Sequence, residues 1–151
     1  MVKKSGQLSR SFDREWVFKI AYASMINGDS VEKNYDILKD YNRFRLSDFG
    51  KLYLRIMNEY LNSEELVQPL KENIEKVEFE VLSSMARVLM QMAVAEMKFI
   101  VDTPPEISLN EVLNLAKLYV DDQEKRLINS VLDKTFKSLK EADQLNIGYF
   151  K

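Results

Sequence analysis

The stretch from Glu96 to Leu139, EMKFIVDTPPEISLNEVLNLAKLYVDDQEKRLINSVLDKTFKSL, decides the fold that we expect for this chain. It contains two helical patterns, and each follows residues that typically start a helix. Thr103 offers a capping hydroxyl, Pro104 suits the first helical position, and Glu106 would close a capping box. Residues 121–124, DDQE, place acids where the helix dipole favours them. The stretch therefore predicts two consecutive helices.

The low content of glycine and proline extends this helical character to the rest of the chain. There are four glycines and three prolines, and neither occurs from Leu70 to Thr103 or from Glu106 to Ile147. Such stretches favour helices, whereas strand signals such as sustained alternation or an Asn-Gly turn are missing. We therefore predict an all-α fold, a compact bundle of six or seven helices. Besides the two above, helices are expected over residues 9 or 11 to 25, 31–40, 49–60 and 79–100, and a short helix or a turn over residues 64–74.

The length of 151 residues is typical of one domain. We expect a flexible basic tail over residues 1–8, a single helical domain over residues 9–140 and a C-terminal tail over residues 141–151. The longest apolar-rich stretch, Val81–Val101, is interrupted by charged and polar residues, and the first residues do not resemble a signal peptide. The sequence therefore predicts a soluble cytoplasmic protein with no membrane span.

The composition argues against an enzyme. The chain has no cysteine and no histidine, so it lacks the commonest general base, the commonest transition-metal ligand and any thiol nucleophile. Its adjacent carboxylates lie at expected helix starts, where the helix dipole explains them. No glycine-rich phosphate loop is present. We therefore expect no catalytic site, no metal site and no cofactor.

Basic residues gather at two expected helix starts. The first 19 residues hold five cations and two acids, a local charge of 5 − 2 = +3 on a chain of net charge −2. Arg10 and Arg14 share one face of the first helix, and Lys19 follows in the same helix. Lys125 and Arg126 open the last helix. If the two helix starts converge, these cations would bind a phosphodiester backbone; the alternative is a solvated basic tail.

Three further polar residues need an explanation. Asn110 and Asn129 each lie beside the apolar stripe of their helix, and a buried amide must find hydrogen-bond partners. We interpret them as structural polar residues, internal links that join the last two helices, rather than as ligand contacts. Among the aromatic residues of the first helix, Phe12 and Trp16 are expected in the core, and Tyr22 is the better exposed candidate for a contact with a partner.

Several short motifs resemble those of one protein family. LNE at residues 109–111, AK at 116–117 and LINSVLD at 127–133 are similar to the pattern INEA…LAK…FVNGVLD of the NusB family, the bacterial transcription antitermination factors. DREWVFKIAY at 13–22 resembles the family's ARELALQALY. MQMAVAEM at 90–97 resembles LRIALYEL, and is closer still to the MQMAIAEL form of the Bacteroidetes branch. The likeness runs from about Ser9 to Leu139.

The resemblance implies a helical fold of two packed subbundles. It also implies binding of a boxA-like RNA together with the small-subunit ribosomal protein NusE, within the RNA polymerase antitermination complex, and no catalysis. In the family, the arginine-rich start of the first helix meets RNA; Arg10 and Arg14 remain of that run. Arg126 matches the basic position of the last helix. Tyr22 matches a family tyrosine at the interface with the ribosomal protein.

Other positions depart from the family pattern. Ala86 stands in place of an acid that faces the protein partner, Gln91 in place of a frequent arginine, and Gln123 in place of an acid that contacts RNA. Ser130 replaces the glycine of VNGVLD. The departures motivate an alternative, in which the chain keeps the fold as a protein-interaction module, a homodimer for example, and has weak or lost RNA binding.

Overall fold

The computed structural model describes residues 6–150, which form seven α-helices and one 3₁₀ turn. The helices are α1 (Gly6–Asn27), α2 (Val31–Asn42), α3 (Asp48–Tyr60), α4 (Glu64–Lys71), α5 (Ser84–Phe99), α6 (Pro105–Tyr119) and α7 (Asp122–Glu141), and the turn is η1 (Phe79–Val81). The prediction of an all-α fold is confirmed. The first helix begins at Gly6, so residues 6–8 are helical instead of belonging to a tail; the rest of that expected tail lies outside the described residues.

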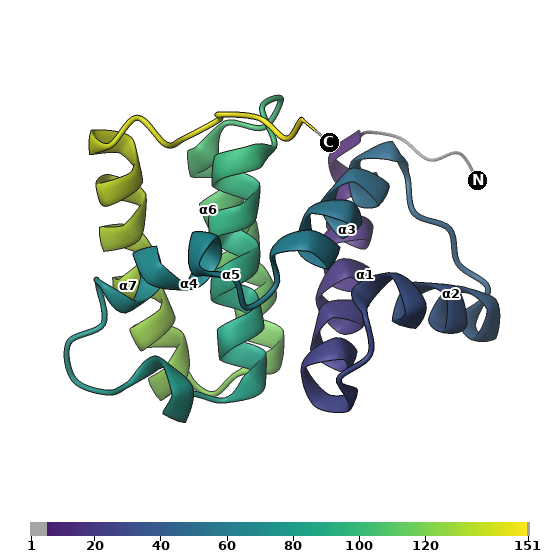
Figure 1. The fold of residues 1–151 in the computed structure, drawn as a ribbon, viewed down its shortest axis with the longest axis horizontal. Coiled ribbons are helices and arrows are strands. Elements are labelled where there is room, and N and C mark those ends of the chain that lie inside the picture. The colour runs from purple at the N-terminus through teal and green to yellow at the C-terminus, as the bar shows by residue number, and fades with distance from the viewer. Residues whose placement is uncertain (1–5, 151) are drawn as a thin grey trace.

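Two groups of helices make up the molecule (Figure 1). Helices α1, α2 and α3 pack against one another, and α4, α5, α6 and α7 form the second group. Helix α5 joins the groups, because it contacts α1 and α3 on one side and α4, α6 and α7 on the other. This arrangement agrees with the two subbundles that the resemblance implied.

Helix α5 is buried over almost its whole length. Met90, Met92 and Met97 have no exposed surface, as expected of flexible side chains that fill irregular gaps between helices. Tyr53 of α3 is also fully buried, and its hydroxyl donates a hydrogen bond of 2.8 Å to the carbonyl oxygen of Met92. The core therefore runs through both groups of helices.

The central helix begins later than the sequence suggested. A helix over residues 79–100 was expected, but Phe79–Val81 is a 3₁₀ turn and α5 starts at Ser84. Ser83 causes the difference, since its hydroxyl accepts a hydrogen bond of 3.1 Å from the backbone N–H of Ala86 and so caps the helix. The carboxylate of Glu124 in α7 holds this cap, accepting from the backbone N–H of Ser83 at 2.9 Å and from its hydroxyl at 2.8 Å.

The two predicted starts in the last third have different outcomes. Asp121 caps α7, since its carboxylate accepts a hydrogen bond of 2.8 Å from the backbone N–H of Glu124. The expected capping box of α6 is wrong: the helix begins at Pro105, Pro104 occupies the cap position, and no side chain caps it. The hydroxyl of Thr103 is used elsewhere, because it accepts a hydrogen bond from Arg10 of α1.

A buried carboxylate of α1 caps α3. Asp13 is 1% exposed and accepts hydrogen bonds from the backbone N–H of Ser47 at 3.2 Å, from the hydroxyl of Ser47, and from the backbone N–H of Gly50 at 3.1 Å. An anion is favourable there because the first N–H groups of a helix have no partner within the helix. Gly50 permits the approach, since a Cβ at this position would lie 2.7 Å from Cγ of Asp13.

The segment after α7 crosses the top of the molecule towards the first group of helices (Figure 1). The backbone N–H groups of Asn146 and Ile147 donate to the carbonyl oxygens of Met97 and Lys98, at 2.8 and 2.7 Å. Tyr149 packs edge-on against Phe99, with ring centroids 6.4 Å apart. We call residues 142–150 the strap. Its backbone N–H groups bind carbonyl oxygens at the end of α5 that have no partner within the helix. The sequence had predicted a tail for these residues.

Candidate nucleic-acid interface

Arg14, one of the expected RNA-binding cations, lies inside the molecule. Its side chain is 4% exposed, and its guanidinium donates two hydrogen bonds to the fully buried Glu96 of α5, from Nε to Oε1 at 2.9 Å and from Nη2 to Oε2 at 2.6 Å. The hydroxyl of Ser108 donates to the same carboxylate at 2.9 Å. Glu111 adds a second, longer ion pair of 3.8 Å. We call these four residues the buried junction.

The charges of the buried junction stabilise each other. Burial alone would lower the pKa of Arg14, but the hydrogen bonds and the charge of Glu96 outweigh it and raise that pKa above its ordinary value. Burial, followed by the charge of Glu96, raises the pKa of Tyr53 well above its usual range. Arg14 is therefore a cation whose donors face a carboxylate, and this position does not favour the expected contact with RNA.

Arg10 is partly exposed, and it too has polar partners within the molecule. Its Nη1 donates to the hydroxyl of Thr103 at 2.6 Å, and its Nη2 pairs with the exposed carboxylate of Asp102 at 2.8 Å. Its guanidinium also lies over the ring of Phe49, 4.4 Å from the centroid. The start of α1 is therefore fastened to the loop between α5 and α6.

The two basic helix starts do not converge, so that hypothesis is wrong. Arg10 meets the start of α6, whereas Lys125 and Arg126 follow the end of α6. Helix α6 has 15 residues, which corresponds to about 22 Å. In Figure 1 the starts of α1 and α7 lie at opposite ends of the bundle. The expected four-cation site is thereby divided into two separate places.

A polar hollow lies between α6 and α7. Its volume is about 420 Å³. It is lined by three amides, three cations and one leucine: Asn110, Asn114, Asn129, Lys117, Lys125, Arg126 and Leu113. We call it the α6/α7 hollow. Amides and cations together suit a nucleic acid, because cations bind phosphates and amides hydrogen-bond to base edges.

The expectation that Asn110 and Asn129 are internal links is wrong. Both side chains are exposed, although the structure does bring them together on the surface as lining of the α6/α7 hollow. The reason is helical phase. The buried residues of α6 include Ser108 and Val112, and Asn110 stands two residues from each, which turns it to the opposite side of the helix.

A simple spacing signal in the sequence would have found this hollow. Asn110, Asn114 and Lys117 are spaced i, i+4 and i+7, so they share one face of α6. Arg126 and Asn129 are spaced i and i+3 on α7. Reading these residues as two facing polar stripes, and not as interruptions of apolar ones, indicates a polar surface between the helices.

The cations of the α6/α7 hollow are largely unpaired. Arg126 and Lys117 are exposed and form no ion pair with any other residue that the structure describes. Lys125 has only a long contact of 3.9 Å with the exposed Asp122, and an ion pair this exposed contributes little. These groups therefore remain available to an anionic ligand, in contrast to those of the buried junction.

Lys19 and Tyr22 lie on α1, outside the α6/α7 hollow. Nζ of Lys19 stands 4.6 Å from the ring centroid of Trp16 and 3.8 Å from the carboxylate of Glu15. Tyr22 is half-buried, with its ring 6.2 Å from that of Phe18.

Of the aromatic residues expected in the core, Trp16 is half-buried and Phe12 is 45% exposed, so Phe12 contradicts that expectation.

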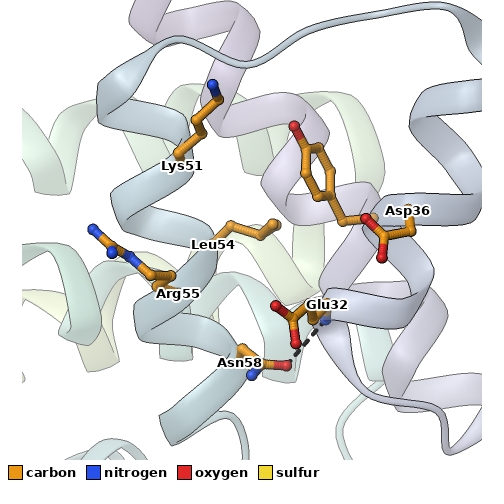
Figure 2. Close-up of a pocket in the computed structure, with 7 residues that line it drawn as sticks. Glu32, Asp36, Lys51, Leu54, Arg55 and Asn58 are labelled. Carbon is orange, nitrogen blue, oxygen red and sulfur yellow. Dashed lines mark hydrogen bonds between the residues drawn. The ribbon is translucent and has the colours of Figure 1, made fainter. Parts of the chain in front are cut away.

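Another hollow, of about 300 Å³, opens between α2 and α3 (Figure 2). Its two sides differ in charge: Glu32 and Asp36 come from α2, and Lys51 and Arg55 from α3. The backbone N–H of Glu32 donates to the side-chain oxygen of Asn58 at 3.0 Å and closes one end. Because it carries both signs of charge, this hollow is less suited to a polyanion than the α6/α7 hollow.

Comparison with known proteins places the chain in a family. Residues 12–137 match the model of the NusB family. This chain belongs to the NusB family. Among its relatives is the transcription antitermination protein NusB of Chloroherpeton thalassium, which is 26% identical over 146 residues, covering 92% of this chain and 66% of the relative. The NusB of Oceanobacillus iheyensis is 27% identical over 129 residues, covering 84% of this chain and 98% of the relative.

Solved structures of the NusB family have the same fold. A crystal structure of the antitermination factors NusB and NusE in complex with double-stranded RNA matches with a TM-score of 0.75 at 18% identity, covering 86% of this chain and 97% of that chain. T. maritima NusB matches with a TM-score of 0.75 at 23% identity, covering 95% and 100%. Within residues 6–150, no helix combines the length and the apolar character needed to cross a membrane.

Proposed function

We propose that this chain is a non-enzymatic adaptor in transcription antitermination. It binds a boxA-like RNA together with the small-subunit ribosomal protein NusE, as part of the RNA polymerase antitermination complex in the cytoplasm. The observation that carries the proposal is membership of the NusB family over residues 12–137. The relatives are named as transcription antitermination proteins, and one solved relative was crystallised with NusE and RNA.

The α6/α7 hollow is the RNA contact that we favour. It holds Lys117 and Arg126 without ion pairs and Lys125 with a weak one, next to three exposed amides. A single-stranded RNA would place phosphates on the cations and base edges on the amides. Arg10, at the other end of α6, would make a separate and weaker contact, since its carboxylate partner Asp102 is exposed and an exposed ion pair exchanges readily.

The protein contact is proposed on α1. Tyr22 is half-buried and lies beside Phe18 on α1, whose ring also contacts Tyr119 of α6. Lys19 precedes it by one turn. The position that many relatives reserve for an acid is the fully buried Ala86 here, so Tyr22 and its neighbours would carry more of the contact with the ribosomal protein.

Fluorescence anisotropy tests the proposal. A labelled boxA-like RNA and a scrambled RNA of equal length are titrated with the chain, with and without the ribosomal protein, at about 50–100 mM salt, where phosphate contacts are strong. We expect preferential binding of the boxA-like RNA, strengthened by the ribosomal protein and weakened by added salt. Absence of binding in both settings would overturn the proposal and favour the alternative, a protein-interaction module, whose homodimer light scattering would detect.

A further inference from the structure

The connection between α2 and α3 is held rigidly although it is short and exposed. The ring of Phe44 stacks on Trp16 with centroids 3.9 Å apart and planes 11° apart. Phe12 and Tyr35 meet the same ring edge-on, at 6.3 and 6.2 Å. Leu46 is 2% exposed. The half-buried Phe44 and the buried Leu46 therefore hold the backbone on both sides of residue 45.

The two arginines of this connection point to solvent without partners. Arg43 ends α2 in the left-handed conformation, with φ 55°. Arg43 and Arg45 are exposed, and neither side chain forms a hydrogen bond or an ion pair within residues 6–150. Other cations of the described residues differ in this respect: Arg10, Arg14, Lys19 and seven lysines of α2 to α7 have carboxylate partners.

The acids that flank the connection do not neutralise it. Asp40 and Asp48 are exposed and pair with neither arginine. Asp48 lies in the first turn of α3, where the unpaired N–H groups of the helix offset its negative charge. The two guanidinium groups therefore remain available to an external anion.

The basic surface continues onto α3. Lys51 and Arg55 are exposed, one helical turn apart, and form no ion pair. Figure 2 shows both side chains directed away from the carboxylates of Glu32 and Asp36 across the hollow. Four cations without ion pairs thus follow one another from the end of α2 along α3.

Exposed aromatic rings accompany these cations. Tyr41, two residues before Arg43, is 85% exposed, and Phe12 is 45% exposed at the edge of the ring cluster around Phe44. Proteins that bind single-stranded nucleic acids combine cations that follow the backbone with rings on which bases stack. Paired helical RNA offers no unstacked bases, so this combination fits a single strand better than a duplex.

We propose that the α2–α3 connection and the adjoining face of α3 form a second contact for single-stranded RNA, separate from the α6/α7 hollow. Arg43 and Arg45 bind phosphates, Lys51 and Arg55 extend the track, and Tyr41 stacks on a base. This inference rests on the proposed function, which supplies the identity of the RNA. It adds a second RNA-binding surface to the one in the α6/α7 hollow. A strand held at both places would pass over α1, the helix of the first group that contacts both α5 and α6.

Charge-removing variants test the second contact. In Arg43→Asn with Arg45→Gln, asparagine keeps the left-handed conformation of residue 43 accessible, so the connection stays folded. The matched control is Lys76→Gln with Lys140→Gln, which removes two exposed cations without ion pairs from the other group of helices. Binding of a labelled single-stranded boxA-like RNA is measured with the ribosomal protein present, across a salt series.

We expect the arginine variant to bind roughly tenfold more weakly at about 100 mM salt, and its plot of log K against log salt to become less steep by about 1.4, from two lost phosphate contacts at about 0.7 each. The control should keep the wild-type slope. Tyr41→Ala should weaken binding without changing the slope, because a stacked ring carries no charge.

The outcomes separate this inference from the proposed function. Wild-type binding with equal slopes for the arginine variant and the control would overturn the second contact and leave the proposed function standing. No binding by the wild-type chain, with or without the ribosomal protein, would overturn both. A reduced slope in the arginine variant alone supports the second contact.

Discussion

Arginine has opposite roles at the two ends of α6. At its start, Arg14 is buried and spends its donors on Glu96 and Glu111, whereas beyond its end Arg126 is exposed beside three amides and has no ion pair. Helix α1 begins at Gly6 and α7 at Asp122, so Arg14 lies deeper in its helix than Arg126 does, although the sequence pattern assigned both to RNA binding. The difference teaches that a basic residue in the early turns of a helix stays available to a ligand only where no buried carboxylate lies opposite.

Removal of the buried arginine should have the largest effect. Arg14→Ala leaves the carboxylate of Glu96 buried with only Ser108 as a partner, so we expect a loss of about 3–5 kcal/mol in the free energy of unfolding. Urea unfolding followed by circular dichroism measures it. The matched variant Arg126→Ala should change stability by less than about 0.5 kcal/mol. Equal effects at the two positions would remove the contrast between them.

The second prediction concerns Asp13, the buried carboxylate of α1 that caps α3. In an exposed helix, replacing glycine with alanine normally stabilises by about 1 kcal/mol. Gly50→Ala should instead destabilise by roughly 1–3 kcal/mol, because the new Cβ would meet Asp13, whose three hydrogen bonds hold it in place. Thermal unfolding compares this variant with Lys51→Ala at the next, exposed position. A more stable Gly50→Ala protein would contradict the close approach.

The third prediction concerns the exposed cations of α7. Their removal should weaken RNA binding and leave the free energy of unfolding unchanged. Lys125→Gln with Arg126→Gln removes two cations of the α6/α7 hollow, and we expect affinity for boxA-like RNA to fall by about 1–2 kcal/mol and the salt slope to fall by about 1.4. The control, Lys134→Gln with Lys137→Gln, removes two exposed lysines from the same helix, each paired with an acid. A control that lost as much affinity would place the RNA elsewhere on α7.

The smallest effect should appear at high pH, at the contact between α1 and α6. Burial, then the hydrogen bond to Glu15, raises the pKa of Tyr119 to about 12. A raised pKa means that folding favours the protonated hydroxyl, so this stabilisation is complete below about pH 10, the ordinary tyrosine value, and is lost as the pH rises to about 12. Tyr119→Phe should be less stable than wild type at pH 8, and the gap should close above pH 10. A gap independent of pH would contradict the hydrogen bond.

The architecture was accessible from the sequence because it depends on local patterns. Helical spacing predicted the helices apart from residues 64–74, which were expected as a short helix or a turn. The acids at residues 121–124 marked the start of α7, where the partner of Asp121, Glu124, is only three residues away. The cap at Thr103 failed because Arg10, from 93 residues earlier in the chain, takes its hydroxyl. Non-local partners of this kind leave no periodic trace.

The candidate site was predicted in part, for the same reason. Lys125 and Arg126 were named as RNA contacts and are available in the structure; their role in binding stays a prediction. The position of Arg14 depends on Glu96, 82 residues away, and could not be read from the first helix alone. The surface position of Asn110 and Asn129 could have been predicted from the sequence. Counting about 100° per residue from the apolar positions of each helix places both side chains on the outer face.

The strap ties the folding of the two groups of helices together. Tyr149 donates a hydrogen bond of 2.9 Å to Glu59 in α3, a contact between residues 90 positions apart, while its neighbours bond to the end of α5. Contacts of such long sequence separation form late, because the intervening chain must first be ordered. Once formed, the strap prevents α3 and α5 from separating without its own release. Neither group of helices then opens alone, and the molecule should unfold in one cooperative step.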